Sequence, residues 1–175
     1  MPINATDTLL QLSQYQGEAR RTAYYPACPP ITAAPQHWRG NLLYCTMGLV
    51  GELGEIAEAG DKDDLLLEVG DAFWYAANIC DSTGDHLNYL WKAGRQLYRS
   101  SNRPTETAIT APLNSCKKLW RDGYSQAKFA TYVQDVAIAL GWADSVRVAN
   151  GLDLLAVLQA NLDKLAPKAK PPAIS

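Results

Sequence analysis

Apolar residues recur at helical spacing through most of the chain. In the first such segment, residues 7–23, Leu9, Leu12 and Tyr15 stand at this spacing among polar residues. The same spacing predicts further helices over residues 37–59, 63–82, 85–100, 106–121, 125–140 and 152–165. The sustained alternation of apolar and polar residues that is typical of a strand is not seen. The pattern therefore predicts an all-α helical bundle.

Prolines, glycines and short polar turns mark the breaks between these helices. Residues 25–35 hold four prolines and predict an irregular loop. The turn at residues 61–64 is so short that the helices on either side should pack antiparallel, and its aspartates can cap the second of them. The segment 141–151 begins and ends with glycine and predicts a break before the last helix.

Glycines are frequent inside the second predicted helix. A glycine inside a helix costs up to about 1 kcal/mol relative to alanine. Such residues therefore suggest the close approach of another backbone or of a ligand. The positions are Gly40, Gly48, Gly51 and Gly54.

Length and charge narrow the class of protein. The 175 residues suit one domain over residues 1–166, and the tail at 167–175 is expected to be disordered. A net charge of −2 gives no basic field for a nucleic acid.

No signal peptide or apolar run of about 18–20 residues for a membrane span is present, so a cytoplasmic protein without nucleic-acid or membrane partners is expected. The cysteines lack the spacing of zinc ligands.

Two pairs of acidic residues stand on consecutive predicted helices. Glu52 and Glu55 are three residues apart and share one helix face, and Glu68 and Asp71 repeat this spacing. In an antiparallel hairpin both pairs reach a common point, where four carboxylates suit a hard cation such as Mg²⁺ or Mn²⁺. Glutamates at this spacing also fit a solvated helix face. Their apolar neighbours count toward a metal site, because buried unpaired carboxylates are costly, and the pattern alone leaves both interpretations open.

The sequence around these acids resembles the MazG-like all-α nucleoside triphosphate pyrophosphohydrolases, in particular the phage-type members. The shared pattern is Glu-x-x-Glu, a spacer and Glu-x-x-Asp, which residues 52–55 and 68–71 match. Two flanking segments are similar as well: Tyr-Gln followed by Arg-Thr over residues 15–22, and Asn-x-x-Lys-Leu over residues 161–165. The resemblance covers about residues 10–82 and 150–166, whereas residues 85–148 do not align.

The resemblance implies Mg²⁺- or Mn²⁺-dependent hydrolysis of a (d)NTP, with dGTP or GTP as the expected substrate, to the monophosphate and pyrophosphate. It implies a bundle completed as a homodimer or homotetramer. The four acids would bind the metal, and Glu52 or Glu55 would also orient the attacking water. Further side chains are expected to contact the nucleotide: Tyr15, Arg21, Trp38, Lys62, Asn78, Asn161 and Lys164.

The chain departs from this family pattern at two places. Gly51 stands where many members carry another glutamate, which leaves the general base undecided. Pro167 and Lys168 replace the basic residue that often closes the last motif. Other interpretations remain open: a dUTPase-like or phosphoribosyl-ATP pyrophosphohydrolase-like enzyme, or a non-catalytic helical protein whose acids are surface charges and whose apolar stripes bind a partner.

Overall fold

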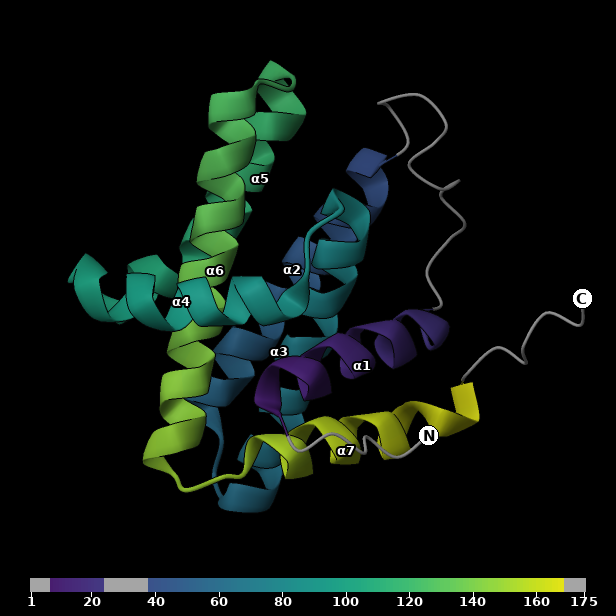
Figure 1. Ribbon diagram of the computed structural model, residues 1–175. Helices are drawn as coiled ribbons and strands as arrows, with labels where there is room; N and C mark the ends of the chain where they lie inside the picture. The colour runs from purple at the N-terminus through teal and green to yellow at the C-terminus, as the bar shows by residue number, and fades with distance from the viewer. Residues whose placement is uncertain (1–6, 24–37, 169–175) are drawn as a thin grey trace, which may run out of the picture.

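The computed structural model describes residues 7–23 and 38–168, and this part of the chain is all-helical, as the periodicity predicts (Figure 1). The predicted loop at residues 25–35 lies outside the described residues. Residues 169–175 of the tail, which is expected to be disordered, also lie outside the described residues. The start of that tail differs from the expectation, because Ala166–Lys168 forms a 3-10 turn that continues the last helix.

Seven α-helices and that turn make up the described part of the chain. The first helix, α1, begins after Asp7, whose carboxylate accepts a hydrogen bond from the Leu9 backbone N–H. The carboxylate of Asp61 accepts from two N–H groups at the start of α3, so the predicted capping turn is confirmed. The helices are α1 (Thr8–Arg21), α2 (Trp38–Glu58), α3 (Lys62–Thr83), α4 (Leu87–Ser101), α5 (Thr105–Asp122), α6 (Gln126–Ala149) and α7 (Leu154–Leu165).

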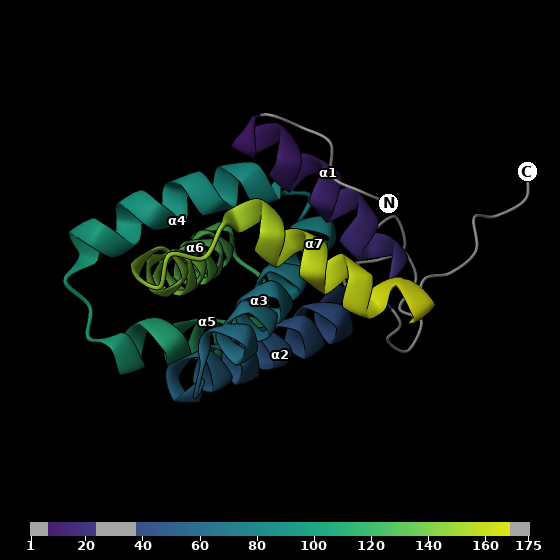
Figure 2. The same ribbon diagram turned by 90° about the horizontal axis from the view of Figure 1, so that it is seen from below.

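Helix α3 lies at the centre of the arrangement. It pairs with α2 in an antiparallel hairpin, and α1 and α7 lie side by side across it (Figures 1 and 2). Helix α4 crosses α6, which pairs with α5 on the other side of the molecule. The buried residues of α3, among them Val69, Phe73 and Ala76, contribute to a continuous apolar core. Within the described residues, no helix is both long and apolar enough to cross a membrane.

The predicted break at residues 141–151 is wrong over most of its length. Helix α6 continues nine residues beyond residue 140 and ends at Ala149. Gly141 interrupts nothing, because it is the point where α4 crosses. A Cβ on Gly141 would lie 2.2 Å from the Gly94 carbonyl oxygen, so the missing side chain lets the two backbones touch. The chain turns only at Gly151, where φ is +67°.

The glycines of α2 have different explanations. Gly48 packs against the ring of Tyr75, and a Cβ there would lie 2.2 Å from it, so the close neighbour at this position is a side chain rather than the expected backbone or ligand. Beyond the helix itself, no described atom lies within 4 Å of a Cβ built on Gly51 or Gly54. Close packing within the described chain is therefore the wrong explanation for those two glycines.

Candidate functional site

The hairpin of α2 and α3 brings together three of the four predicted metal ligands. Glu52 and Glu55 come from α2 and Glu68 from α3, and one carboxylate oxygen of each lies within 4.8 Å of the others. Glu52 and Glu68 are partly buried, while Glu55 is exposed. The antiparallel pairing explains this convergence, because residues before the turn on α2 face residues after it on α3.

Burial and the neighbouring acids change the protonation of Glu52 and Glu68. Burial raises the pKa of Glu52 to about 8, with further contributions from its hydrogen bond to Glu68 and from the negative charges of Asp71 and Glu55. Burial also raises the pKa of Glu68, and Glu55 and Asp71 add to the effect. With a pKa of about 8, Glu52 therefore retains a proton at neutral pH unless a positive charge takes its place. Three oxygen donors this close together fit a hard divalent cation.

The fourth predicted ligand, Asp71, is engaged by α7. Its Oδ1 accepts a hydrogen bond of 2.6 Å from Asn161 Nδ2, and its Oδ2 lies 2.5 Å from Lys164 Nζ. Asp71 does not belong to the group whose oxygens lie within 4.8 Å of one another. Its negative charge still acts on Glu52 and Glu68. The predicted residues Asn161 and Lys164 are thus at the site, and both contact Asp71.

Tyr15 lies beneath the acids rather than beside an open pocket. Its hydroxyl donates toward Asn161 Oδ1 at 2.7 Å and the Gly70 carbonyl oxygen at 3.2 Å. Tyr15 and Asn161 are both fully buried, and burial raises the pKa of the Tyr15 phenol. The phenol therefore stays protonated and orients Asn161, which in turn holds Asp71. This geometry makes Tyr15 a positioning residue and leaves no room for stacking on a nucleotide.

A cavity of about 250 Å³ opens beside the acids. On one wall the Tyr44 and Tyr75 ring centroids lie 6.2 Å apart, and on another the Trp74 Nε1–H donates to Thr22 Oγ1 at 2.8 Å. Aromatic rings thus stand next to carboxylates and to one ammonium group. The lining residues are Thr22, Tyr44, Glu52, Asp71, Trp74, Tyr75, Lys164 and Leu165.

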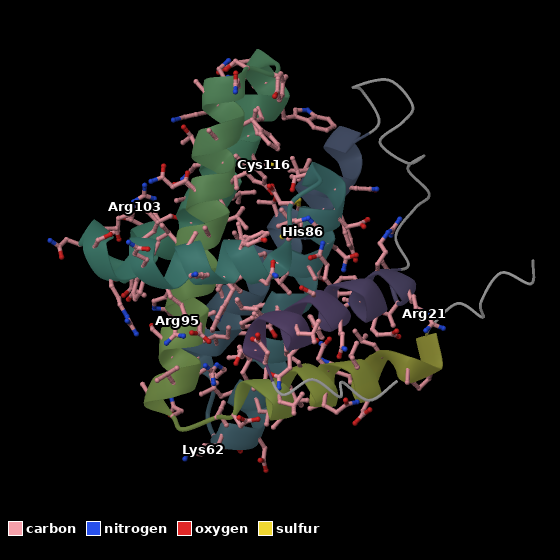
Figure 3. All side chains as sticks on the ribbon, in the orientation of Figure 1. Arg21, Lys62, His86, Arg95, Arg103 and Cys116 are labelled. Carbon is pink, nitrogen blue, oxygen red and sulfur yellow. The ribbon has the colours of Figure 1, made fainter. Side chains whose placement is uncertain are left out.

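Three other predicted contacts are absent from the described lining of this cavity. Arg21 forms an ion pair of 3.0 Å with Glu18 on its own helix, and Lys62 is exposed at the start of α3 (Figure 3). Asn78 is fully buried, and its side chain donates to the Trp74 carbonyl oxygen at 2.9 Å. Trp38 begins α2, but its side chain lies outside the described residues.

Several lining residues are not among the sequence predictions, and Thr22 and Tyr44 are two of them. Thr22 belongs to the Arg-Thr segment of the family resemblance, but only its neighbour Arg21 is predicted to contact the nucleotide. Tyr44 lies eight residues before Glu52, which places both on one face of α2. Extending the helical face of the acids backward by two turns would have found it.

Comparisons with known proteins identify a relative without stating an activity. No family model matches the chain, and no solved structure matches it significantly. The Gene 37 protein of Mycobacterium phage L5 is 37% identical over a stretch that covers 38% of this chain and 67% of the phage protein. The name of that protein gives no substrate or reaction. The chain belongs to the same protein family as the Gene 37 protein of Mycobacterium phage L5.

Proposed function

We propose that the protein is a Mg²⁺- or Mn²⁺-dependent nucleoside triphosphate pyrophosphohydrolase that converts a (d)NTP, with dGTP or GTP as the first candidates, to the monophosphate and pyrophosphate. One observation carries the proposal: the carboxylates of Glu52, Glu55 and Glu68 converge within 4.8 Å beside a cavity. The family resemblance at residues 52–55 and 68–71 points to the same chemistry.

The acidic group supports the proposal of a bound cation, because its carboxylates repel one another when no cation lies between them. The high pKa of Glu52 reflects burial next to other carboxylates, and a divalent ion would take the place of the retained proton. Such an ion supplies charge neutralisation on the phosphates and an aligned water. Asp71 is the proposed fourth ligand, and Glu52 or Glu55 the group that orients the water.

The cavity supports the proposal of a nucleotide substrate, because cationic and aromatic groups lie together in its lining. Lys164 is the lining residue with a positive charge, and its ammonium can turn from Asp71 to a phosphate oxygen. The rings of Tyr44 and Tyr75 offer a surface on which a base can stack, a contact that tolerates every base. The Thr22 hydroxyl donates to the Ala19 carbonyl and accepts from Trp74, so it is already satisfied and does not select the base.

A homodimer or homotetramer is part of the proposal. Tyr44 is 44% exposed and Met47 58% exposed on the outer face of α2, and Leu67 of α3 is 37% exposed. Large apolar side chains exposed on this hairpin favour a second copy that covers them. Light scattering at working concentration should show an assembly larger than 19.1 kDa, and a monomer would contradict this part.

Thermal unfolding with and without metal tests the proposed site. The protein in EDTA should unfold at a lower temperature than in Mg²⁺ or Mn²⁺, because only a folded site gains stability by binding. Glu55→Gln should remove most of this difference. Glu58→Gln is the matched control, since Glu58 is exposed on the same helix one turn further on and is not in the acidic group. No metal effect in the wild type would favour the non-catalytic interaction protein.

A further inference from the structure

A second cavity, of about 400 Å³, lies between α5 and α6, within residues 85–148, which have no counterpart in the family resemblance. Helix α5 turns a polar stripe toward it, including Thr110, Asn114 and Lys118 at helical spacing. The opposite side of α5 is buried in the core through Cys116 and Leu119. The polar stripe therefore faces the cavity and takes no part in the apolar core of the molecule.

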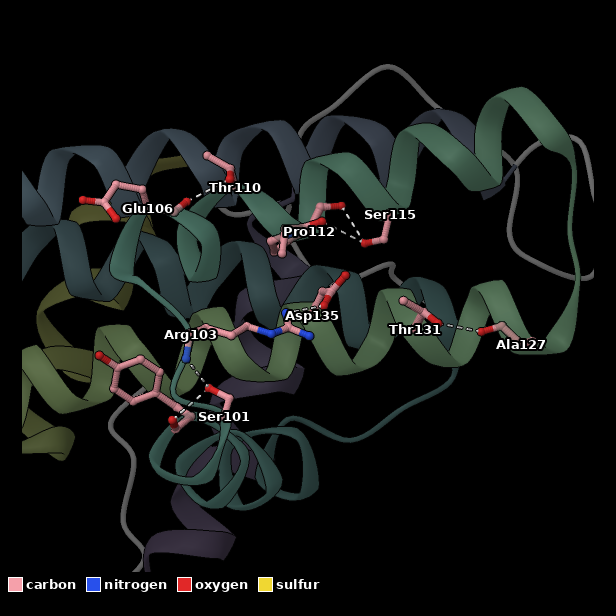
Figure 4. Close-up of polar contacts among 11 residues, drawn as sticks. Ser101, Arg103, Glu106, Thr110, Pro112, Ser115, Ala127, Thr131 and Asp135 are labelled. Carbon is pink, nitrogen blue, oxygen red and sulfur yellow. Dashed lines mark hydrogen bonds and ion pairs between the residues drawn. The ribbon is translucent and has the colours of Figure 1, made fainter.

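The cavity carries more positive than negative charge. Arg103, Lys118 and Lys128 line it, and Asp135 is the single acid among its lining residues. Figure 4 shows Arg103 reaching from the α4–α5 connection between the two helices, where its Nη1 lies 2.7 Å from Asp135 Oδ1. Asp135 is only 7% exposed, so its charge is already neutralised by that arginine.

Most hydrogen-bond donors of these cations remain available. A guanidinium has five N–H donors, and within the described chain the Arg103 side chain uses one, to Asp135. Lys128 Nζ makes a long bond of 3.4 Å to the Asp122 carbonyl oxygen. Lys118 Nζ donates to no described residue. An arginine fork and two ammonium groups around one space suit a phosphate, which accepts several charge-assisted hydrogen bonds.

The hydroxyl groups in the walls present acceptors. Thr110 Oγ1 donates to the Glu106 carbonyl at 2.8 Å, and Thr131 Oγ1 donates to the Ala127 carbonyl at 3.0 Å (Figure 4). Because their hydrogens are engaged within the helices, lone pairs are left for a ligand. Asn114 adds an amide that both donates and accepts. A ligand that satisfies these walls carries hydroxyl groups as well as a phosphate.

We infer that this cavity binds a sugar phosphate, either free or as part of a nucleoside monophosphate. Its volume of about 400 Å³ falls in the range of small-molecule sites, about 300–1,000 Å³. The site is built from α5, α6 and the α4–α5 connection, whereas the acidic site is built from α2, α3 and α7. The inference therefore does not depend on the proposed hydrolysis.

Isothermal titration in EDTA tests the inference, because without metal the acidic site repels phosphates. Ribose 5-phosphate, adenosine 5′-monophosphate and inorganic phosphate are titrated into the full chain. Lys118→Gln should weaken binding of the sugar phosphate about tenfold, the loss expected for one charge-assisted hydrogen bond. Lys117→Gln is the matched control, since Lys117 is exposed on the same helix and does not line the cavity. It should change the affinity less than about twofold.

Each outcome has a defined meaning. Equal binding of ribose 5-phosphate and the nucleotide supports a free sugar phosphate as ligand, and tighter binding of the nucleotide supports the nucleoside monophosphate. Absence of saturable binding at about 10 mM of either ligand would overturn the inference. So would an equal loss in Lys117→Gln and Lys118→Gln, which would indicate attraction to charge alone. Inorganic phosphate binding as tightly as ribose 5-phosphate would overturn the assignment to a sugar phosphate.

Discussion

The Lys164 ammonium nitrogen lies 2.5 Å from Asp71 Oδ2, across 93 residues of sequence. The pair joins α7 to α3 at the edge of the acidic group, and the Lys164 side chain is 42% exposed while that of Asp71 is 18% exposed. Lys164 therefore neutralises one acid and still reaches the cavity. Under the proposed function, a phosphate that enters the cavity would compete with Asp71 for the same ammonium group.

Replacing Lys164 tests its part in substrate binding. Lys164→Gln should raise KM for the nucleotide about tenfold, because one charge-assisted hydrogen bond to phosphate is lost, and should leave the helical circular dichroism unchanged. Steady-state kinetics of purified variants measures this. Lys62→Gln is the control, since Lys62 is exposed at the start of α3 and outside the cavity. Equal KM values for both variants would show that Lys164 is only a surface partner of Asp71.

The protonation of Glu52 predicts how stability depends on pH without metal. Its pKa is raised from 4.5 to about 8 in the folded protein, so folding there favours the protonated acid. This contribution to stability is complete below about pH 4.5 and is lost as the pH rises through about 8. In EDTA, the unfolding temperature should fall between about pH 5 and about pH 9, and less so in Glu52→Gln. Parallel profiles for the two proteins would contradict the assigned cause.

The buried hydroxyl of Tyr15 should stabilise the folded protein through its hydrogen bond to Asn161. Tyr15→Phe keeps the ring but leaves Asn161 Oδ1 without its donor at 2.7 Å, so the free energy of unfolding should fall by about 1–2 kcal/mol. Urea unfolding followed by circular dichroism measures the change. Tyr89→Phe removes a hydroxyl from a side chain that is 66% exposed and should have little effect. A Tyr15→Phe protein as stable as Tyr89→Phe would show that the Tyr15 hydroxyl does not stabilise the fold.

The crossing of α4 and α6 should not tolerate a side chain at Gly141. Gly141→Ala places a Cβ 2.2 Å from the Gly94 carbonyl oxygen, and separating the helices should cost at least about 2 kcal/mol of stability. Gly17→Ala is the opposite case, because nothing lies within 4 Å of its Cβ in α1 and alanine is the better helix former. Gly17→Ala should therefore stabilise by about 0.5–1 kcal/mol. Thermal unfolding of both variants should give shifts of opposite sign.

Local patterns predicted most of the fold, and the main error has a tertiary cause. Helical spacing and capping residues placed six of the helices within two residues of their observed ends. Because glycine has a poor helix propensity, the sequence predicts a break at Gly141. Its actual role is a contact with Gly94, 47 residues earlier, and no local pattern reports which helix will cross at that point.

The acidic group was predictable for the same local reason, whereas its surroundings were not. Spacing of three residues on two helices joined by a short turn brings Glu52, Glu55 and Glu68 together. The engagement of Asp71 depends on how α7 packs across α3, and the role of Tyr15 depends on α1. Those packings are set by the whole core, so the sequence pattern could place the residues on helices but could not pair them.

Pyrophosphate release from a panel of nucleoside triphosphates, with Mg²⁺, with Mn²⁺ and in EDTA, measures the proposed activity directly. The wild type should release pyrophosphate and the matching monophosphate from at least one (d)NTP, dGTP or GTP first, and only with metal. Glu55→Gln and Asp71→Asn should abolish the release while keeping the helical circular dichroism. Absence of metal-dependent pyrophosphate release from every nucleotide, or near-normal turnover in either variant, would contradict the proposed function.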